Sequence, residues 1–156
     1  MRLALFEPDI PQNTGTLMRL CACMDVPLDI IEPCGFLLSD KNLKRAGMDY
    51  IDKLDLRRHN SWAAFREAHA GRRLVLLTTW SAQPFTDFAF TENDILIAGR
   101  ESTGVPEAIH NACDARIRIP MMRGVRSLNI ALASAMALSE ALRQCGLYPQ
   151  PEEEQI

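Results

Sequence analysis

Short apolar runs alternate along this chain with segments of helical periodicity, and this alternation constrains the fold more than any other feature. The runs at 73–79 (RLVLLTT) and 94–98 (DILIA) have unbroken apolar centres, as strands buried on both faces do. Further strands are predicted at 2–7, 28–32, 51–56 and 115–119, and helices at 13–23, 39–46, 61–70, 106–111 and 127–145. Strands that alternate with helices predict an α/β fold, with a mostly parallel sheet and helices on both faces.

The length of the chain, 156 residues, fits one domain, and we expect that domain to span residues 1–148. Residues 149–156 contain three glutamates and no basic residue, which predicts a frayed acidic tail. Hydrophobic residues make up 47% of the chain, and this share excludes a disordered protein.

The cysteines and histidines give no sign of a metal site. The five cysteines lack C-x-x-C spacing, and His59, His69 and His110 stand far apart in the sequence. No secretory signal is visible, and no apolar stretch reaches the roughly 20 residues that span a bilayer. We therefore expect a soluble cytoplasmic protein with reduced thiols, no metal and no membrane association.

Four loops follow the predicted strands, at 8–14, 78–84, 99–106 and 120–127, and all are rich in Gly, Pro, Asn or Ser. Ligands of open α/β sheets bind beyond the carboxyl ends of the strands. The sequence therefore predicts a ligand site where these loops meet.

Three of these regions carry candidate functional residues. In 11–19 (PQNTGTLMR), Asn13 or Thr14 is expected to cap a helix that carries Arg19 in its second turn. In 97–107 (IAGRESTGVPE), Gly99 would let a ligand approach the backbone closely, and Glu101 places a charge at the mouth of a buried strand. Each pattern is also compatible with an ordinary turn or cap.

The third region is 119–129 (IPMMRGVRSLN), where Ser127 is expected to cap the last helix and Asn129 to lie in its first turn. The free N–H groups of a helix N-terminus bind anions, so two polar side chains there favour a ligand site. A simple N-cap remains the structural alternative.

Basic residues are concentrated in one part of the chain, because nine of the 17 fall between positions 41 and 73. Lys41, Lys44 and Arg45 would share one face of a short helix, and Arg57 and Arg58 follow. Such a zone favours an acidic partner such as a phosphate backbone, although a solvated surface would show the same pattern.

The last predicted helix, from Ser127 to Cys145, has apolar residues around nearly its whole circumference. A helix of this kind must be buried on all sides. At the end of a chain of this length it predicts a subunit interface, with a fully internal helix as the alternative.

Three segments resemble, in order, the three motifs of the SPOUT RNA methyltransferases. They are N-T-G with its following arginine, I-A-G-R-E-S-T-G-V-P, and I-R-I-P-M with S-L-N. The resemblance extends over residues 3–148, because two further segments match: F-E-P-D-I-P-Q-N-T-G and D-K-N-L-K-R-A-G-M-D-Y. It implies an α/β fold with a C-terminal trefoil knot, S-adenosylmethionine as cofactor, and a homodimer formed through the last helix. The implied activity is ribose 2'-O-methylation in the tRNA anticodon stem-loop, at the wobble cytidine or modified uridine of leucine isoacceptors.

The resemblance also implies roles for particular residues. The cofactor pocket would be lined by Leu77, Gly99, Ile119 and Ser127. The catalytic residues would be Arg19, Glu101, Ser127 and Asn129. With RNA as the implied substrate, the basic residues expected to bind it are Lys41, Lys44, Arg45, Arg57, Arg58 and Arg123.

Two positions depart from the pattern, because relatives often have proline where Arg100 stands and arginine where Thr103 stands. No role is transferred to either residue. Two other functions remain open: an RNA-binding module without activity, and a nucleotide enzyme on an open doubly wound sheet. The absence of a G-x-G-x-x-G fingerprint disfavours the latter.

Overall fold

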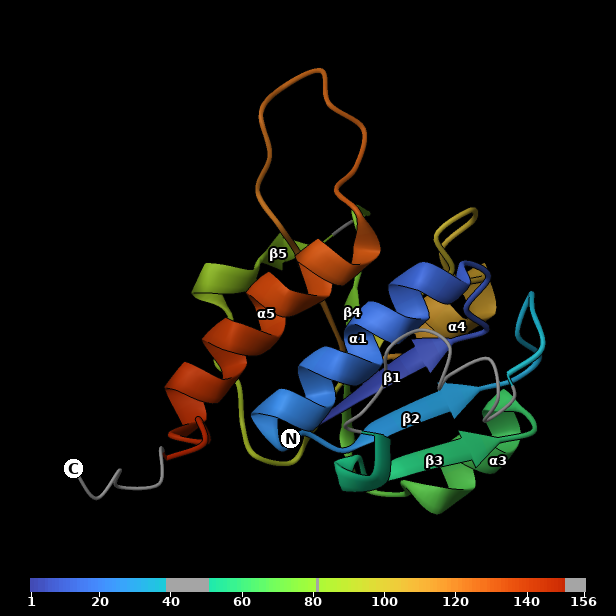
Figure 1. Cartoon of the computed structure of the whole chain (residues 1–156). Helices are drawn as coiled ribbons and strands as arrows, with labels where there is room; N and C mark the ends of the chain where they lie inside the picture. The colour runs from blue at the N-terminus through green and yellow to red at the C-terminus, as the bar shows by residue number, and fades with distance from the viewer. Residues whose placement is uncertain (39–50, 81, 151–156) are drawn as a thin grey trace.

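Seven strands and their connecting helices form one α/β unit in the computed structural model, which describes residues 1–38, 51–80 and 82–150 (Figure 1). The strands are β1 (Arg2–Phe6), β2 (Leu28–Ile31), β3 (Leu56–His59), β4 (Arg73–Leu77), β5 (Gln83–Pro84), β6 (Asp94–Ala98) and β7 (Ala115–Arg118). The helices are α1 (Pro11–Met24), α3 (Trp62–Ala68), α4 (Glu107–Ala112) and α5 (Ile130–Cys145), with 3-10 turns η1 (Ile51–Lys53) and η2 (Phe85–Asp87).

All neighbouring strands pair in parallel, in the order β3-β2-β1-β6-β4-β7-β5. The predicted sheet is therefore confirmed, and it is entirely parallel. Every residue of β1 and β6 is buried, as expected for central strands covered on both faces. Because parallel strands all end at the same edge, the loops after β1, β4, β6 and β7 are brought together.

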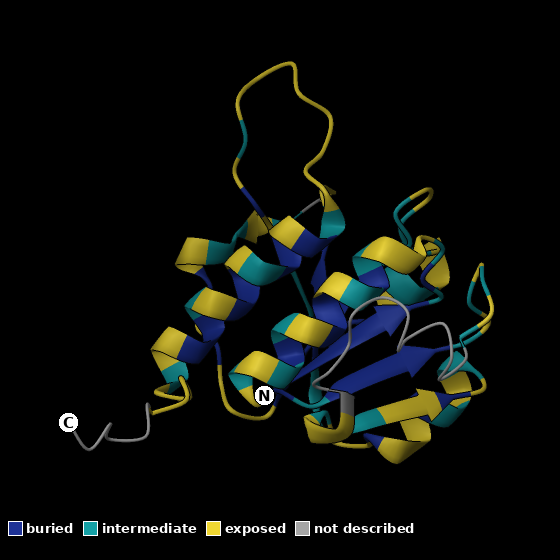
Figure 2. Cartoon of the chain, in the orientation of Figure 1, coloured by how far each residue is buried: buried dark blue, intermediate teal, exposed yellow. Residues whose placement is uncertain are grey.

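Helices cover both faces of the sheet, as predicted. One face packs against α1 and α5 in a large apolar core that includes Leu17, Met18 and Leu138. The other face packs against α3 and α4 in a smaller core around Phe65 and Cys113. Figure 2 shows buried strands between helices that expose their outer sides. No helix in the described part of the chain is long and apolar enough to cross a membrane.

The prediction of a strand at 51–56 is wrong. Residues 51–53 form the turn η1, and the strand β3 begins only at Leu56. This strand lies at the edge of the sheet and pairs only with β2, so Arg57 and Arg58 face solvent within it. A search for apolar runs therefore missed its position.

The starts of two helices also differ from the prediction. The helix α1 begins at Pro11, and neither Asn13 nor Thr14 caps it, because proline at the first position already has helical φ and lacks an N–H. The helix α5 begins at Ile130, and its N-cap is Asn129 rather than Ser127. The predicted helix at 39–46, with Lys41, Lys44 and Arg45, lies outside the described residues.

The helix α5 is not buried on all sides within one chain. Its inner face, with Ser134, Ala137 and Ala141, is buried, whereas Leu132 is 59% and Met136 is 43% exposed. The apolar circumference seen in the sequence therefore divides into a core face and an uncovered face.

Two of the three histidines meet, contrary to the expectation from their separation in the sequence. Nε2 of His59 lies 2.7 Å, and Nε2 of His69 3.0 Å, from Oδ1 of Asp29, while Nε of Arg2 donates to Oδ2 at 2.6 Å. All four residues are buried, and the rings of His59 and His69 pack against Phe65 of α3. We call Arg2, Asp29, His59 and His69 the buried cluster.

The ligand atoms of Asp29, His59 and His69 lie within 4.8 Å of one another, as they would around a metal ion. However, the Arg2 guanidinium binds the same carboxylate, and its positive charge would oppose a cation there. Both carboxylate oxygens of Asp29 already accept hydrogen bonds, and we therefore interpret the buried cluster as a structural network.

Candidate active site

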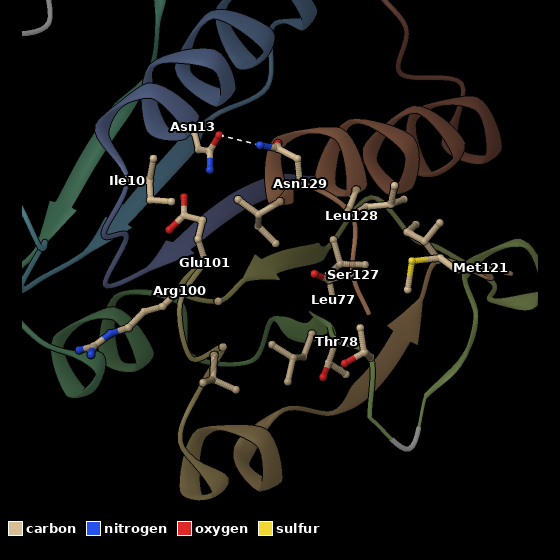
Figure 3. Close-up of a pocket in the computed structure, with 18 residues that line it drawn as sticks. Ile10, Asn13, Leu77, Thr78, Arg100, Glu101, Met121, Ser127, Leu128 and Asn129 are labelled. Carbon is tan, nitrogen blue, oxygen red and sulfur yellow. Dashed lines mark hydrogen bonds between the residues drawn. The ribbon is translucent and has the colours of Figure 1, made fainter. Parts of the chain in front are cut away.

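A pocket of about 420 Å³ lies at the carboxyl edge of the sheet, where the loops after β1, β4, β6 and β7 converge (Figure 3). Its size is within the range of small-molecule sites, roughly 300–1,000 Å³. The described residues that line it are Ile10, Asn13, Leu76, Leu77, Thr78, Thr79, Gly99, Arg100, Glu101, Gly104, Val105, Ile119, Met121, Ser127, Leu128, Asn129, Ile130 and Ala133. The predicted convergence of the four loops is therefore confirmed.

The loop after β6 forms one wall of the pocket by folding back on itself. The backbone groups of Arg100 and Gly104 exchange two hydrogen bonds, at 3.0 and 2.9 Å. A side chain at Gly99 would meet the backbone of Gly104 at 2.8 Å, and Gly104 itself has a φ of +69°. The segment that closely approaches Gly99 is therefore the returning loop itself. The same loop presents Glu101 to the pocket.

Glu101 is held by a reciprocal contact with Asp9, a residue for which the sequence predicted no role. The backbone N–H of Asp9 donates to the Glu101 carboxylate at 3.3 Å, and the N–H of Glu101 donates to Oδ1 of Asp9 at 3.1 Å. The hydroxyl of Ser102 donates to the second oxygen of Asp9. In the sequence, Asp9 stands in a strand-end loop and in the F-E-P-D-I-P-Q-N-T-G segment of the resemblance, but neither signal assigned it a role.

Burial, followed by the hydrogen-bonded carboxyl of Asp9, raises the pKa of Glu101. The same pairing with Glu101, together with Ser102, lowers the pKa of Asp9. The two carboxyls thus titrate as a pair, and Glu101 is the member that binds a proton more readily.

Two helix N-termini meet at the pocket through a pair of asparagines. The side chain of Asn129 donates to Oδ1 of Asn13 at 3.0 Å, as Figure 3 shows. Its own Oδ1 accepts the N–H groups of Ala131 at 2.9 Å and Leu132 at 3.3 Å, which caps α5. Ser127 lies exposed in the loop before this cap and lines the pocket. The prediction that Ser127 caps the helix is wrong because Asn129 does so.

The pocket has the chemistry that S-adenosylmethionine requires. Leu77 and Ile119 are apolar, almost fully buried lining residues, of the kind that could pack against an adenine ring. Thr78, Asn13 and Glu101 add polar groups to the lining, which a ribose or a charged amino-acid group could use. The predicted residues Leu77, Gly99, Ile119 and Ser127 all line this one cavity, which fits the implied cofactor.

Other predicted residues lie away from the pocket. Arg19 is exposed on α1 and is not among the described lining residues. Arg57 and Arg58 lie on the far edge strand β3, where they pair with Asp55 and Glu32. Arg123 is exposed in the loop that leads from β7 to α5.

Arg100 lines the pocket but is directed elsewhere. Its guanidinium pairs with Glu7, and Figure 3 shows the side chain pointing away from Asn13, Glu101 and Asn129. Glu7 has a φ of +44°, an uncommon value for a residue with a side chain. The pair links the end of β1 to the loop after β6 on the outside of the pocket.

The sequence model of the SpoU rRNA Methylase family matches residues 1–139. A protein of Beijerinckia indica subsp. indica, named tRNA (cytidine(34)-2'-O)-methyltransferase, is 59% identical over 92% of this chain and 91% of its own length. A protein of the same name from Escherichia coli K12 is 42% identical over 96% of both chains.

Solved structures agree with these sequence matches. One is described as giving structural insights into the 2-OH methylation of C/U34 on tRNA. It has a TM-score of 0.86 and 44% sequence identity to this chain, and the match covers 92% of this chain and 94% of the other. The SpoU methyltransferase AviRb from Streptomyces viridochromogenes, in complex with AdoMet, has a TM-score of 0.77 and 26% identity over 92% of this chain and 60% of its own.

Proposed function

This chain belongs to the SpoU methylase family and has its α/β fold with a C-terminal trefoil knot, and from this premise we propose that it methylates the ribose 2'-hydroxyl of nucleotide 34 in tRNA. The methyl donor is S-adenosylmethionine. The observation that carries the proposal is the convergence of the three motif loops and the end of β4 on one pocket.

The chemistry needs few groups from the protein. The cofactor supplies an activated methyl group, and the ribose hydroxyl is a poor nucleophile that must be aligned and must lose a proton. Leu77, Gly99, Ile119 and Ser127 would hold the cofactor. Asn129, fixed by Asn13 and by the first turn of α5, would orient the ribose.

Glu101 is suited to accept a hydrogen bond or a proton from the ribose hydroxyl. Its pKa is raised above the usual range of a glutamate, which makes it the more basic carboxylate of the pair with Asp9. Asp9 would act as a positioning residue, because its contact with Glu101 runs through the backbone N–H of each residue.

Arg19 would bind a phosphate next to the target ribose. It lies on the exposed side of α1 rather than on the pocket wall of its own chain. This placement favours a role in the site of a second copy, if the two copies associate through the neighbouring helix α5.

The exposed residues Leu132 and Met136 of α5 support such a homodimer. Light scattering after size exclusion tests it: Leu132→Glu should give a monomer, while Ala108→Glu, at an exposed position on α4, should remain a dimer. A wild-type monomer at micromolar concentration would contradict the proposal.

The RNA would be the anticodon stem-loop of leucine isoacceptors, in the cytoplasm. The five free cysteines are compatible with a reducing compartment. Arg57, Arg58 and Arg123 would contact phosphates, together with Lys41, Lys44 and Arg45. An RNA that reached both Arg123 and β3 would extend across several strands of the sheet.

Mass spectrometry of nucleosides tests the function directly. The purified protein is incubated with S-adenosylmethionine and bulk tRNA that lacks 2'-O-methylation, and new methyl groups are located. A methyl group at nucleotide 34 of leucine tRNA supports the full proposal, and one at another ribose removes the assignment to nucleotide 34. Cofactor binding without any transfer would favour an RNA-binding module.

Arg19→Ala in the same assay should lower kcat at least about 100-fold while the Kd for the cofactor changes less than about twofold. Arg66→Ala, on the opposite face of the sheet, is the matched control. Equal losses of turnover and cofactor affinity would exclude the proposed role of Arg19.

A further inference from the structure

The connection from β4 to β5 crosses the carboxyl end of β7. Leu77, the last residue of β4, and Gln83, the first residue of β5, both pair with Ile117 of β7. The N–H of Thr78 also donates to the carbonyl oxygen of Ile117 at 2.9 Å. Trp80 therefore belongs to the connection that passes from β4 to β5 at the carboxyl end of β7.

Trp80 is 76% exposed, which is unusual for a tryptophan. The other tryptophan, Trp62, packs against Phe6 and Phe65 with ring centroids 6.0 and 5.3 Å away. The backbone N–H of Trp80 donates to the hydroxyl of Thr78 at 3.2 Å, and Thr78 and Thr79 line the pocket. An uncovered indole thus stands directly beside the pocket wall.

The loop from β7 to α5 presents further exposed groups next to this edge of the sheet. Met122 and Val125 are exposed apolar residues, and Arg123 and Arg126 are exposed cations. Figure 1 shows this loop projecting from the body of the protein beyond β5 and the start of α5. The two loops that line the pocket after β4 and β7 therefore also carry an exposed aromatic ring, aliphatic side chains and positive charge.

This combination matches the chemistry of single-stranded RNA. Unpaired bases stack on aromatic side chains, and arginines contact the phosphates between them. A target ribose that enters the pocket must leave the adjacent bases outside, on the rim. We propose that Trp80 stacks on a base of the RNA loop next to the methylated nucleotide, and this inference rests on the proposed function.

Substitutions separate stacking from other roles of Trp80. Trp80→Ala should raise the Kd and KM for an anticodon stem-loop about 5- to 150-fold, because stacking contributes roughly 1–3 kcal/mol per base. Trp80→Phe should recover most of the affinity, whereas Trp80→Leu, which is apolar but not aromatic, should not. The Tm and the Kd for S-adenosylmethionine should stay unchanged in all three variants.

Fluorescence gives a readout that does not depend on catalysis. In Trp62→Phe, Trp80 is the single tryptophan. Acrylamide should quench its emission strongly in the free protein and weakly once the stem-loop is bound, and binding should itself reduce the emission.

Each contrary result overturns the inference. Shielding of Trp80 before RNA is added would show that protein covers it, and a weaker Kd for the cofactor in Trp80→Ala would place it against the cofactor. An unchanged KM and Kd for RNA in Trp80→Ala would exclude stacking. The wild-type protein serves as the control for the proposed function. If it methylates nucleotide 34 but Trp80→Ala leaves RNA binding unchanged, only this inference fails. If the wild type does not methylate tRNA, the proposed function fails.

Discussion

The molecule contains two carboxylate clusters that differ in how completely they are paired. In the buried cluster, Asp29 is fully buried and both of its oxygens accept hydrogen bonds, from Arg2 on one side and His59 and His69 on the other. At the pocket, Glu101 is partly exposed, and its carboxylate accepts a hydrogen bond from the backbone N–H of Asp9.

The difference also appears in the acidity of the two groups. Burial alone would raise the pKa of Asp29, but the hydrogen bonds from Arg2, His59 and His69 together lower it. At Glu101 burial and Asp9 both raise the pKa. A carboxylate surrounded by donors stabilises the fold in its charged form, whereas one beside a second carboxylate is prepared to take up a proton.

The comparison is tested most severely by Asp29→Ala. This change leaves the buried guanidinium of Arg2 without its main partner, and we expect a loss of about 3–5 kcal/mol in the free energy of unfolding. Urea denaturation measures it. Asp55→Ala is the matched control, because Asp55 is half-exposed and 3.4 Å from Arg2, and it should cost no more than about 1 kcal/mol. Equal losses would mean that the cluster is not a structural network.

Glu101→Ala should show the opposite pattern. We expect kcat for methyl transfer to fall about 100-fold, as for loss of a group that aids proton transfer, while the free energy of unfolding changes by less than about 1 kcal/mol. Steady-state kinetics and urea denaturation of the same sample measure both. A large loss of stability with little loss of kcat would remove Glu101 from the reaction.

The pH dependence of activity should follow the pair at the pocket. If transfer needs ionised Glu101, kcat falls as the pH drops through its raised pKa, at a higher pH than for an ordinary glutamate. Asp9→Asn removes the neighbouring charge, so the fall should move to lower pH. A pH profile of kcat that is the same in both proteins would contradict the coupling.

The pH dependence of stability should follow the buried cluster. Because the pKa of Asp29 is lower in the folded than in the unfolded state, its contribution is complete above the unfolded value, about 3.9, and is lost as the pH falls through the folded value. Unfolding at a series of acidic pH values should therefore show a steeper loss in the wild type than in Asp29→Asn.

The smallest effect is expected at the link between the two helix N-termini. Asn129→Ala removes the cap of α5 and the bond to Asn13, and should lower the free energy of unfolding by about 1 kcal/mol. Asn129→Ser, which keeps a capping oxygen, should recover most of this stability without recovering the bond to Asn13. If both variants are equally unstable, capping is not the main contribution of Asn129.

Local sequence patterns were sufficient for much of this protein. The strand at 94–98 was predicted with its observed bounds, and the helix predicted at 61–70 is present as α3, at 62–68. The ligand edge was predicted because parallel strands end together, so that Gly99, Ile119 and Ser127 had to approach one another. Buried apolar runs and the edge at which parallel strands end follow from local residue patterns, and these features were predicted from the sequence alone.

Contacts between distant segments were decided by the tertiary structure. His59 and His69 meet at Asp29, and Asp9 meets Glu101, because the strand order brings together residues far apart in the chain. Asn129 rather than Ser127 caps α5, and it also reaches Asn13 at the start of α1. No local periodicity encodes these pairs, since they depend on which strands become neighbours and on the register in which they pair.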